Sequence, residues 1–157
     1  MASTSDIRIA SMRPLISPAV LEDELPLRNA GAVAINRARQ ELAEVVSRQN
    51  DRLLVIVGPC SIHDPASALE FAQRLAPLAT QLADDLLIVM RVYFEKPRTV
   101  VGWKGLINDP GLDGSFQINR GLRLARQLLL DITEIGLPIA TEFLDTTLGQ
   151  YYADLIT

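Results

Sequence analysis

Reactive polar side chains lie at or just beyond the ends of three apolar runs in the chain. They are Cys60, Arg91, Lys96 and Glu142. A thiolate ligates transition metals, and guanidinium and ammonium groups bind phosphate or carboxylate. A glutamate in such a site can act as an acid, as a base or as the holder of a water molecule. These residue types indicate a metal-assisted enzyme that acts on small phosphorylated or carboxylated substrates.

Cys60 and His63 are the only cysteine and the only histidine of the chain, and both could touch one metal ion. A closed metal site needs about four ligands, so carboxylates or another segment would have to complete it. Each residue also has a structural interpretation. A free cysteine packs as a small hydrophobe, and His63 could steady the turn before Asp64. A single cysteine excludes an intrachain disulfide, which favours a reducing, cytoplasmic compartment.

Arg91 resists a purely structural interpretation, because a guanidinium within an apolar strand needs an anionic partner. We expect a ligand in that role, and Glu142 on the neighbouring strand could pair with Arg91 as well. The segment Lys96–Thr99 concentrates two cations, a hydroxyl and a rigid proline. This composition predicts a phosphate cradle, and its structural alternative is an ordinary solvated surface.

Buried parallel strands and amphipathic helices are predicted to hold these residues. Strands are expected at 53–57, 86–94 and 138–143, and helices at 31–50, 65–82 and 118–135. Asp64 is the expected N-cap of the middle helix, Pro65 its first residue, and Gly136 the C-terminal cap of the last helix. Pro77 is expected to kink or end the middle helix, and a further helix is expected after Asp145.

The alternation of strands and helices predicts an α/β fold with parallel strands. An open doubly wound sheet and part of a (β/α)8 TIM barrel both fit this pattern. No glycine-rich phosphate loop follows any strand, which favours the barrel. In a barrel, the carboxyl ends of the strands share the face on which active sites are built. We expect residues 1–30, which contain three prolines and no sustained apolar period, to form an arm. Residues 31–157 are expected to form the first three βα units. Because a complete barrel takes about 250 residues, this part would be incomplete at the C-terminus.

The composition is that of a globular protein. Hydrophobic residues make up 48% of the 157 residues and charged residues 22%, with a net charge of −4. The negative charge argues against nucleic acid and anionic membrane surfaces as partners. The apolar runs fall far short of the roughly 18 residues that a membrane span needs.

Four longer strings resemble a known enzyme family. They are Gly58-Pro-Cys-Ser-Ile-His-Asp64, Met90-Arg-Val-Tyr-Phe-Glu-Lys-Pro-Arg-Thr99, Val101-Gly-Trp-Lys-Gly-Leu-Ile-Asn-Asp-Pro110 and Ala140-Thr-Glu-Phe-Leu-Asp145. Their order and content are similar to the N-terminal portion of the microbial, feedback-regulated class I 3-deoxy-D-arabino-heptulosonate-7-phosphate (DAHP) synthases. The resemblance implies a metal-dependent TIM barrel that condenses phosphoenolpyruvate with erythrose 4-phosphate. This reaction is the first step of the shikimate pathway to the aromatic amino acids.

The resemblance also implies roles for individual residues. Cys60 would ligate a divalent metal (Mn, Fe, Co or Zn), and Arg91 and Lys96 would hold phosphoenolpyruvate. Glu142 would lie beside phosphoenolpyruvate and the attacking water, so that Lys96 and Glu142 are the expected catalytic residues. The erythrose 4-phosphate site would be lined by Lys96, Pro97, Arg98 and Thr99.

Regulation is implied as well, because the family's arm and first loops build an oligomer interface and a site for an aromatic amino-acid effector. Residues that match this region are Asp6, Asp145 and Gln150. The string Thr147-Leu-Gly-Gln150 is most similar to tryptophan-sensitive members. We therefore expect a homo-oligomer. The cytoplasm is its expected compartment, as the single cysteine indicates.

Three interpretations of the chain stay open. By resemblance, three further metal ligands and other phosphoenolpyruvate contacts come from later strands, so these 157 residues alone are expected to be inactive. The chain could be part of a longer enzyme, or a short module that associates with full-length synthase subunits. It could also belong to a related metal-dependent phosphosugar synthase, such as the octulosonate enzyme.

Overall fold

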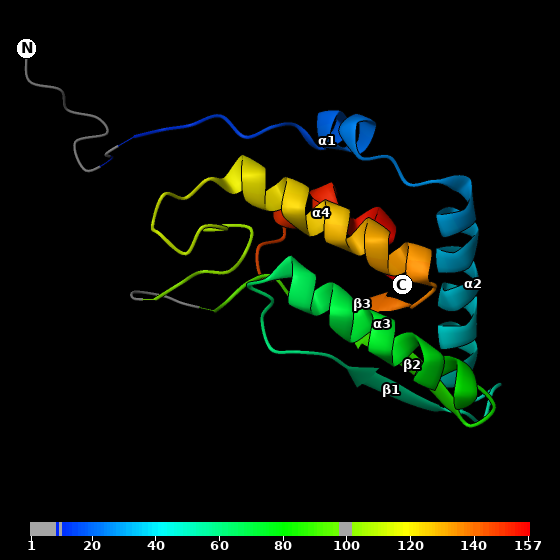
Figure 1. The fold of residues 1–157 in the computed structure, drawn as a ribbon. Helices are drawn as coiled ribbons and strands as arrows, with labels where there is room; N and C mark the ends of the chain where they lie inside the picture. The colour runs from blue at the N-terminus through cyan, green and yellow to red at the C-terminus, as the bar shows by residue number, and fades with distance from the viewer. Residues whose placement is uncertain (1–8, 10, 98–101) are drawn as a thin grey trace, which may run out of the picture.

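The computed structural model describes residues 9, 11–97 and 102–157, which fold into a small parallel sheet with helices packed on one of its faces (Figure 1). In chain order the elements are α1 (Pro18–Glu24), α2 (Asn29–Val46), β1 (Leu53–Val57), α3 (Pro65–Gln81), β2 (Leu86–Arg91), α4 (Ile118–Ile135), β3 (Ile139–Ala140), and the 3-10 helices η1 (Leu148–Tyr151) and η2 (Ala153–Leu155).

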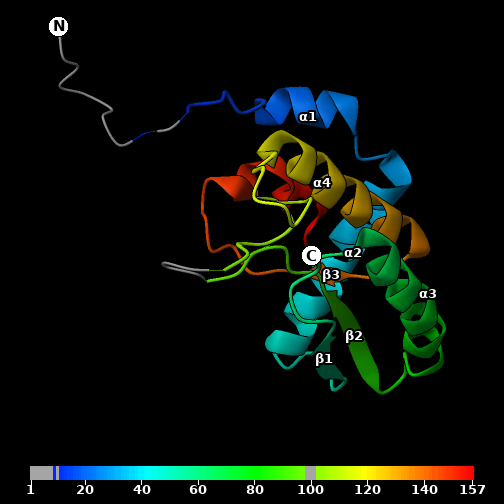
Figure 2. The same ribbon diagram turned by 60° about the vertical axis from the view of Figure 1, so that its left-hand side comes forward.

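The described strands form one sheet in the order β1-β2-β3, and both pairings are parallel. Helices α3 and α4 run side by side over one face of this sheet (Figures 1 and 2). Ile88 and Met90 of β2 and Ile139 of β3 belong to the buried core beneath the two helices. Because partners in a parallel register share a face, Arg91 and its partner Ala140 lie on the opposite face.

Local sequence signals set the helix ends as predicted. Asp64 caps α3, since its Oδ1 accepts a hydrogen bond of 3.0 Å from the Ala66 N–H, and Pro65 is the first helical residue. Gly136 ends α4 in the left-handed conformation with φ of 92°. No helix within the described ranges combines the length and the apolar character needed to cross a bilayer.

Several predictions about elements need correction. Strand β2 ends at Arg91 and does not extend to residue 94. Strand β1 was expected to be buried but is largely exposed, with Leu53 65% and Ile56 53% exposed, because it is the edge strand of the described sheet and pairs only with β2.

Helix α3 does not end at Pro77 but continues to Gln81. The side chains that α3 buries before the proline, Ala72 and Leu75 among them, belong to the core shared with α4 and hold the helix in place. Strand β3 has two residues instead of six, because the chain beyond Ala140 turns away from β2. The helix expected after Asp145 is the short 3-10 helix η1.

The segment before α2 lies across α4 and η1. The Asn119 side chain accepts a hydrogen bond from the Ile16 N–H at 2.9 Å and donates one to the Pro14 carbonyl at 3.1 Å. The Tyr151 hydroxyl donates to the Ile16 carbonyl at 2.7 Å. The arm therefore contributes a helix, α1, whose Leu21 is fully buried in the common core.

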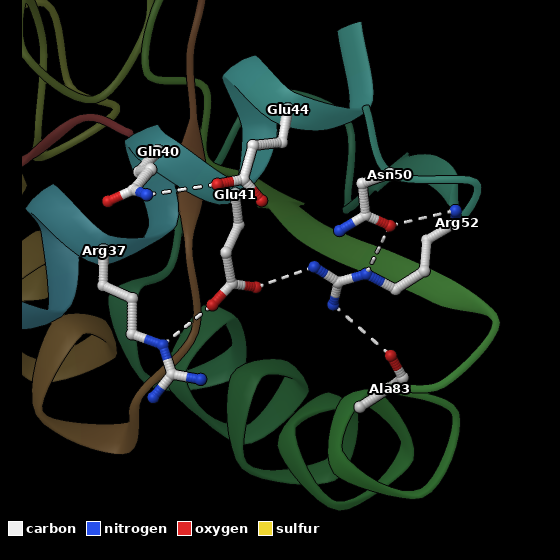
Figure 3. A network of polar contacts seen from close by, with 7 residues as sticks. All are labelled: Arg37, Gln40, Glu41, Glu44, Asn50, Arg52 and Ala83. Carbon is white, nitrogen blue, oxygen red and sulfur yellow. Dashed lines mark hydrogen bonds and ion pairs between the residues drawn. The ribbon is translucent and has the colours of Figure 1, made fainter. Parts of the chain in front are cut away.

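Helix α2 packs near the amino end of the sheet, where a polar network attaches it (Figure 3). Glu41 accepts hydrogen bonds from Arg37 Nε at 2.8 Å and from Arg52 Nη2 at 2.9 Å, and Arg52 also reaches the Ala83 carbonyl at 3.3 Å. The hydrogen bond from Arg52 is the main cause that lowers the pKa of the Glu41 carboxyl. Arg52 precedes β1 and Ala83 precedes β2, so this network lies at the amino end of the sheet. It does not involve the residues at the carboxyl ends of the strands.

Candidate functional site

The four site residues predicted from sequence gather at the carboxyl end of the sheet. Cys60 lies three residues after β1, Arg91 is the last residue of β2, and Glu142 lies two residues after β3. Gly58 allows the chain after β1 to pass close to β2, because a Cβ at this position would lie 2.2 Å from the Arg91 carbonyl oxygen. Any side chain at position 58 would therefore force the two segments apart.

Arg91 and Glu142 form the first of two polar pairs in the site. Arg91 Nε and Nη2 donate to Glu142 Oε1 at 2.9 and 2.5 Å, and Nη1 donates to the Pro59 carbonyl at 3.2 Å. The guanidinium carbon lies 4.5 Å from the centre of the Tyr93 ring, within range of a cation–π contact. The pairing of Arg91 with Glu142 that the sequence left open is confirmed. These contacts use three of the five guanidinium N–H groups, so two are left to bind an anion.

Cys60 and Lys96 form the second pair. Lys96 Nζ donates to Cys60 Sγ at 3.1 Å, and the cysteine is exposed. The hydrogen bond from Lys96, followed by one from the Ser61 backbone, lowers the pKa of the Cys60 thiol. The thiolate is the form of cysteine that binds metals and attacks electrophiles. The arrangement thus favours the reactive form of the only cysteine in the chain.

The side chains of this site can supply one ligand of a metal ion but not a complete set. An exposed cysteine with a lowered thiol pKa is suited to supply one ligand. Within residues 9, 11–97 and 102–157, however, no group of three or more His, Cys, Asp and Glu side chains is placed to hold a metal. His63 is exposed, and the cap of α3 is made by its neighbour Asp64. A metal bound at Cys60 therefore needs ligands from outside this part of the chain.

The other predicted positions lie around the same end of the sheet or outside the described part. Lys96 is half-buried and its N–H donates to the Lys104 carbonyl at 3.1 Å, while Pro97 is exposed. Asp145 lies in the loop after Glu142, and its Oδ1 accepts hydrogen bonds from the Thr147 N–H and hydroxyl. Gln150, in η1, is exposed. The predicted positions outside the described residues are Asp6, Arg98 and Thr99.

Sequence reasoning missed Glu95, a carboxylate buried directly beside the site. Its side chain accepts hydrogen bonds from the Leu144 and Asp145 N–H groups at 3.2 and 3.3 Å. Burial raises the pKa of the Glu95 carboxyl, only partly offset by these two hydrogen bonds. The residue follows the buried run 92–94, and its position directly after the predicted strand 86–94 was the one signal that could have identified it.

Comparisons with known proteins extend over the whole chain. The model of the DAHP synthetase I family matches residues 28–157. The chain is 54% identical over 157 residues to a tryptophan-sensitive phospho-2-dehydro-3-deoxyheptonate aldolase of Enterobacter agglomerans, covering 100% of this chain and 45% of that protein. It is 55% identical over 152 residues to the phenylalanine-sensitive enzyme of Escherichia coli K12, covering 97% and 43%. An aldolase of this name from Amycolatopsis methanolica is 53% identical over 150 residues, covering 96% of this chain and 74% of that protein.

A solved structure agrees with these matches. The phospho-2-dehydro-3-deoxyheptonate aldolase of Francisella tularensis SCHU S4 superimposes with a TM-score of 0.92 at 52% sequence identity. The superposition covers 95% of this chain and 44% of that protein. The chain thus spans less than half the length of three of these four relatives.

Proposed function

Since the chain belongs to the DAHP synthetase I family, we propose that it forms the N-terminal part of an enzyme that condenses phosphoenolpyruvate with erythrose 4-phosphate to DAHP and phosphate. The observation that carries this proposal is the pairing of Arg91 with Glu142 beside the pairing of Cys60 with Lys96 at one end of a parallel sheet. The names of the relatives favour this synthase over the octulosonate enzyme.

Arg91 and Lys96 supply the positive charge that phosphoenolpyruvate requires. The substrate carries a phosphate and a carboxylate, and the two remaining N–H groups of Arg91 can bind one of them in a bidentate manner. Lys96 adds a second cation close by. In the proposed reaction, C3 of phosphoenolpyruvate attacks the aldehyde carbon of erythrose 4-phosphate, water adds at C2, and the tetrahedral intermediate expels phosphate. Cations held in place offset the negative charge that accumulates along this path.

Glu142 has an oxygen available for the water. Both hydrogen bonds from Arg91 go to Oε1, so Oε2 can accept a hydrogen bond from the water that adds at C2. The ion pair fixes the direction of this carboxylate. Glu142 therefore serves as water holder and base, while Arg91 keeps it in place.

Cys60 is the metal ligand that this chain contributes. A divalent metal held there would supply Lewis-acid polarisation of the substrate aldehyde. The hydrogen bond from Lys96 lowers the pKa of the Cys60 thiol, which reduces the cost of deprotonation on metal binding. The remaining ligands are proposed to come from later strands of the enzyme.

We further propose that the sheet β1-β2-β3 is the start of a TIM barrel in a cytoplasmic homo-oligomer. The parallel order, and functional residues after each of the three strands, support this architecture. An aromatic amino-acid effector is proposed to bind near Asp6, Asp145 and Gln150. Relatives named tryptophan-sensitive, phenylalanine-sensitive and tyrosine-inhibited match at 54%, 55% and 47% identity. A preference for tryptophan therefore rests on the string at 147–150 alone.

The test is a chimera in which this chain replaces the matching part of the phenylalanine-sensitive E. coli relative. With Mn²⁺ we expect it to form DAHP from the two substrates. Cys60→Ala should lower the rate by about a hundredfold or more, because Lewis-acid catalysis is worth several kcal/mol. Ser47→Ala, an exposed position at the end of α2, is the matched control and should leave the rate unchanged. A chimera that unfolds cooperatively yet forms no DAHP, beside an active parent enzyme, would contradict the proposal.

A further inference from the structure

Glu95 contacts the two loops of the candidate site that carry Glu142 and Cys60. It is only 5% exposed and follows the buried residues Val92, Tyr93 and Phe94. Within the described part of the chain its carboxylate makes no ion pair with a lysine or arginine. Its oxygens face backbone N–H groups instead. A carboxylate buried at this cost, without a cation, requires an explanation.

The side chain of Glu95 holds the loop that carries Glu142. Oε2 accepts the Leu144 N–H at 3.2 Å and Oε1 accepts the Asp145 N–H at 3.3 Å. At the start of the same loop, the Ala140 carbonyl accepts the Val92 N–H at 2.8 Å. The loop is thus fixed on both sides of Glu142 by residues that lie close together along one segment, 92–95.

The backbone of Glu95 holds the loop that carries Cys60. The Ser61 hydroxyl, which is buried, donates to the Glu95 carbonyl at 2.7 Å. The next residue, Ile62, donates its N–H to the Tyr93 carbonyl at 2.7 Å. Because Lys96 follows Glu95 directly, these contacts bring Cys60 within 3.1 Å of the Lys96 ammonium.

We propose that Glu95 is a positioning residue that orients Glu142 toward Arg91 through the Leu144 and Asp145 amides without touching substrate. The inference rests on the proposed function, since it gives the Arg91–Glu142 pair its role. A carboxylate suits this task because its two oxygens accept two successive N–H groups. A glutamine offers one oxygen and places an NH₂ group against the second N–H, so it satisfies only one of the two donors.

The first test compares Glu95→Gln with wild type in the 157-residue chain by ¹⁵N NMR, without substrate. We expect the Leu144 and Asp145 amides to exchange faster, by about tenfold for the amide that loses its acceptor, because the other keeps a hydrogen bond to a neutral oxygen only. The Arg91 Nε–H signal should move, since Glu142 no longer faces it, while the amides that pair β1 with β2 keep their shifts. The matched control is Glu70→Gln, an exposed position on α3. An unchanged Arg91 Nε–H signal in Glu95→Gln would overturn the proposal.

The second test needs no variant and covers the case in which Glu95→Gln fails to fold. In the wild-type chain, the Leu144 and Asp145 amide signals should follow one titration step above the ordinary range of a glutamate, because burial and the nearby Asp145 carboxylate raise the Glu95 pKa. Two further titratable groups that interact with Glu95, the Tyr93 and Tyr152 hydroxyls, ionise at far higher pH. Lys96 follows Glu95 directly and contacts the Cys60 thiol, but neither of these side chains accepts the Leu144 or Asp145 N–H. The pKa of the Asp145 carboxyl is lowered by its hydrogen bonds with Thr147, so its own step is separate.

Amide signals that follow only the lower step of Asp145 would overturn the proposal. Both tests are made without substrate or metal. They therefore report on Glu95 whether or not the chimera forms DAHP, and a failure of either proposal can be recognised separately.

Discussion

Replacing Arg126 with methionine is expected to lower the free energy of unfolding of the chain by about 3 kcal/mol. Arg126 is 1% exposed, within α4. Its guanidinium donates to the Leu25 carbonyl at 2.8 Å, to the Tyr151 carbonyl at 2.9 Å, and to both oxygens of Asp154 at 2.8 and 2.9 Å. Methionine fills similar space but leaves all four acceptors without this donor. The loss is costly because the residue of one acceptor, Tyr151, is buried, and the others lie in residues that are only partly exposed.

Arg123→Met is the matched control, on the same helix and one turn away. Arg123 pairs with Glu24, but both side chains are about two-fifths exposed (42% and 41%). An exposed ion pair of this kind contributes roughly 1 kcal/mol or less. Urea denaturation followed by circular dichroism measures both variants. If Arg126→Met were no less stable than Arg123→Met, the guanidinium would not be what joins α1 and the 3-10 helices to α4.

Replacing Arg91 with lysine in the chimera is expected to raise the KM for phosphoenolpyruvate at least about tenfold and to lower kcat/KM by about a hundredfold. Lysine keeps the charge but cannot reproduce the planar set of donors. Arg91 holds Glu142 with Nε and Nη2 and the Pro59 carbonyl with Nη1 while it stacks on Tyr93. A lysine that binds the substrate must release Glu142, and the carboxylate then loses its fixed direction.

Arg74→Lys provides the comparison for this prediction. Arg74 pairs with Glu70 on the surface of α3, and its side chain is 79% exposed. The kinetic constants of that variant should equal those of the unmodified chimera, measured with phosphoenolpyruvate varied at saturating erythrose 4-phosphate. Equal kinetic constants for Arg91→Lys and Arg74→Lys would show that the guanidinium geometry of Arg91 has no part in catalysis.

Local signals in the sequence were sufficient for most of the fold. The Asp64-Pro65 pair and Gly136 act on their own turns, so their effects can be read without the rest of the molecule. Leu53–Val57 and Leu86–Met90 are apolar runs without alternation, and both are strands. Pro77 does not end α3, because the packing of this helix against α4 outweighs the local preference of proline.

The sequence predicted those parts of the candidate site that follow from residue type and from position at the end of a strand. Parallel strands bring their carboxyl ends together, and this was enough to place Arg91 beside Glu142 across 51 positions of sequence. The role of Glu95 was not predicted, because its side chain binds backbone N–H groups 49 and 50 residues away. Every residue except proline has such an N–H group, so the sequence does not indicate which ones serve as donors. The short β3 has the same origin, since the chain after Ala140 leaves the backbone pairing with β2 and contacts the side chains of Glu95 and Arg91.

The most direct test of the central claim is a crystal structure of the chimera with phosphoenolpyruvate bound. We predict that the substrate anions contact the free N–H groups of Arg91 and the Lys96 ammonium, with Glu142 still paired to Arg91. Another cleft in the chain, lined by Arg13 and Arg120 among others, also offers guanidinium groups to an anion. Phosphoenolpyruvate bound there, with the carboxyl end of the sheet empty, would contradict the account.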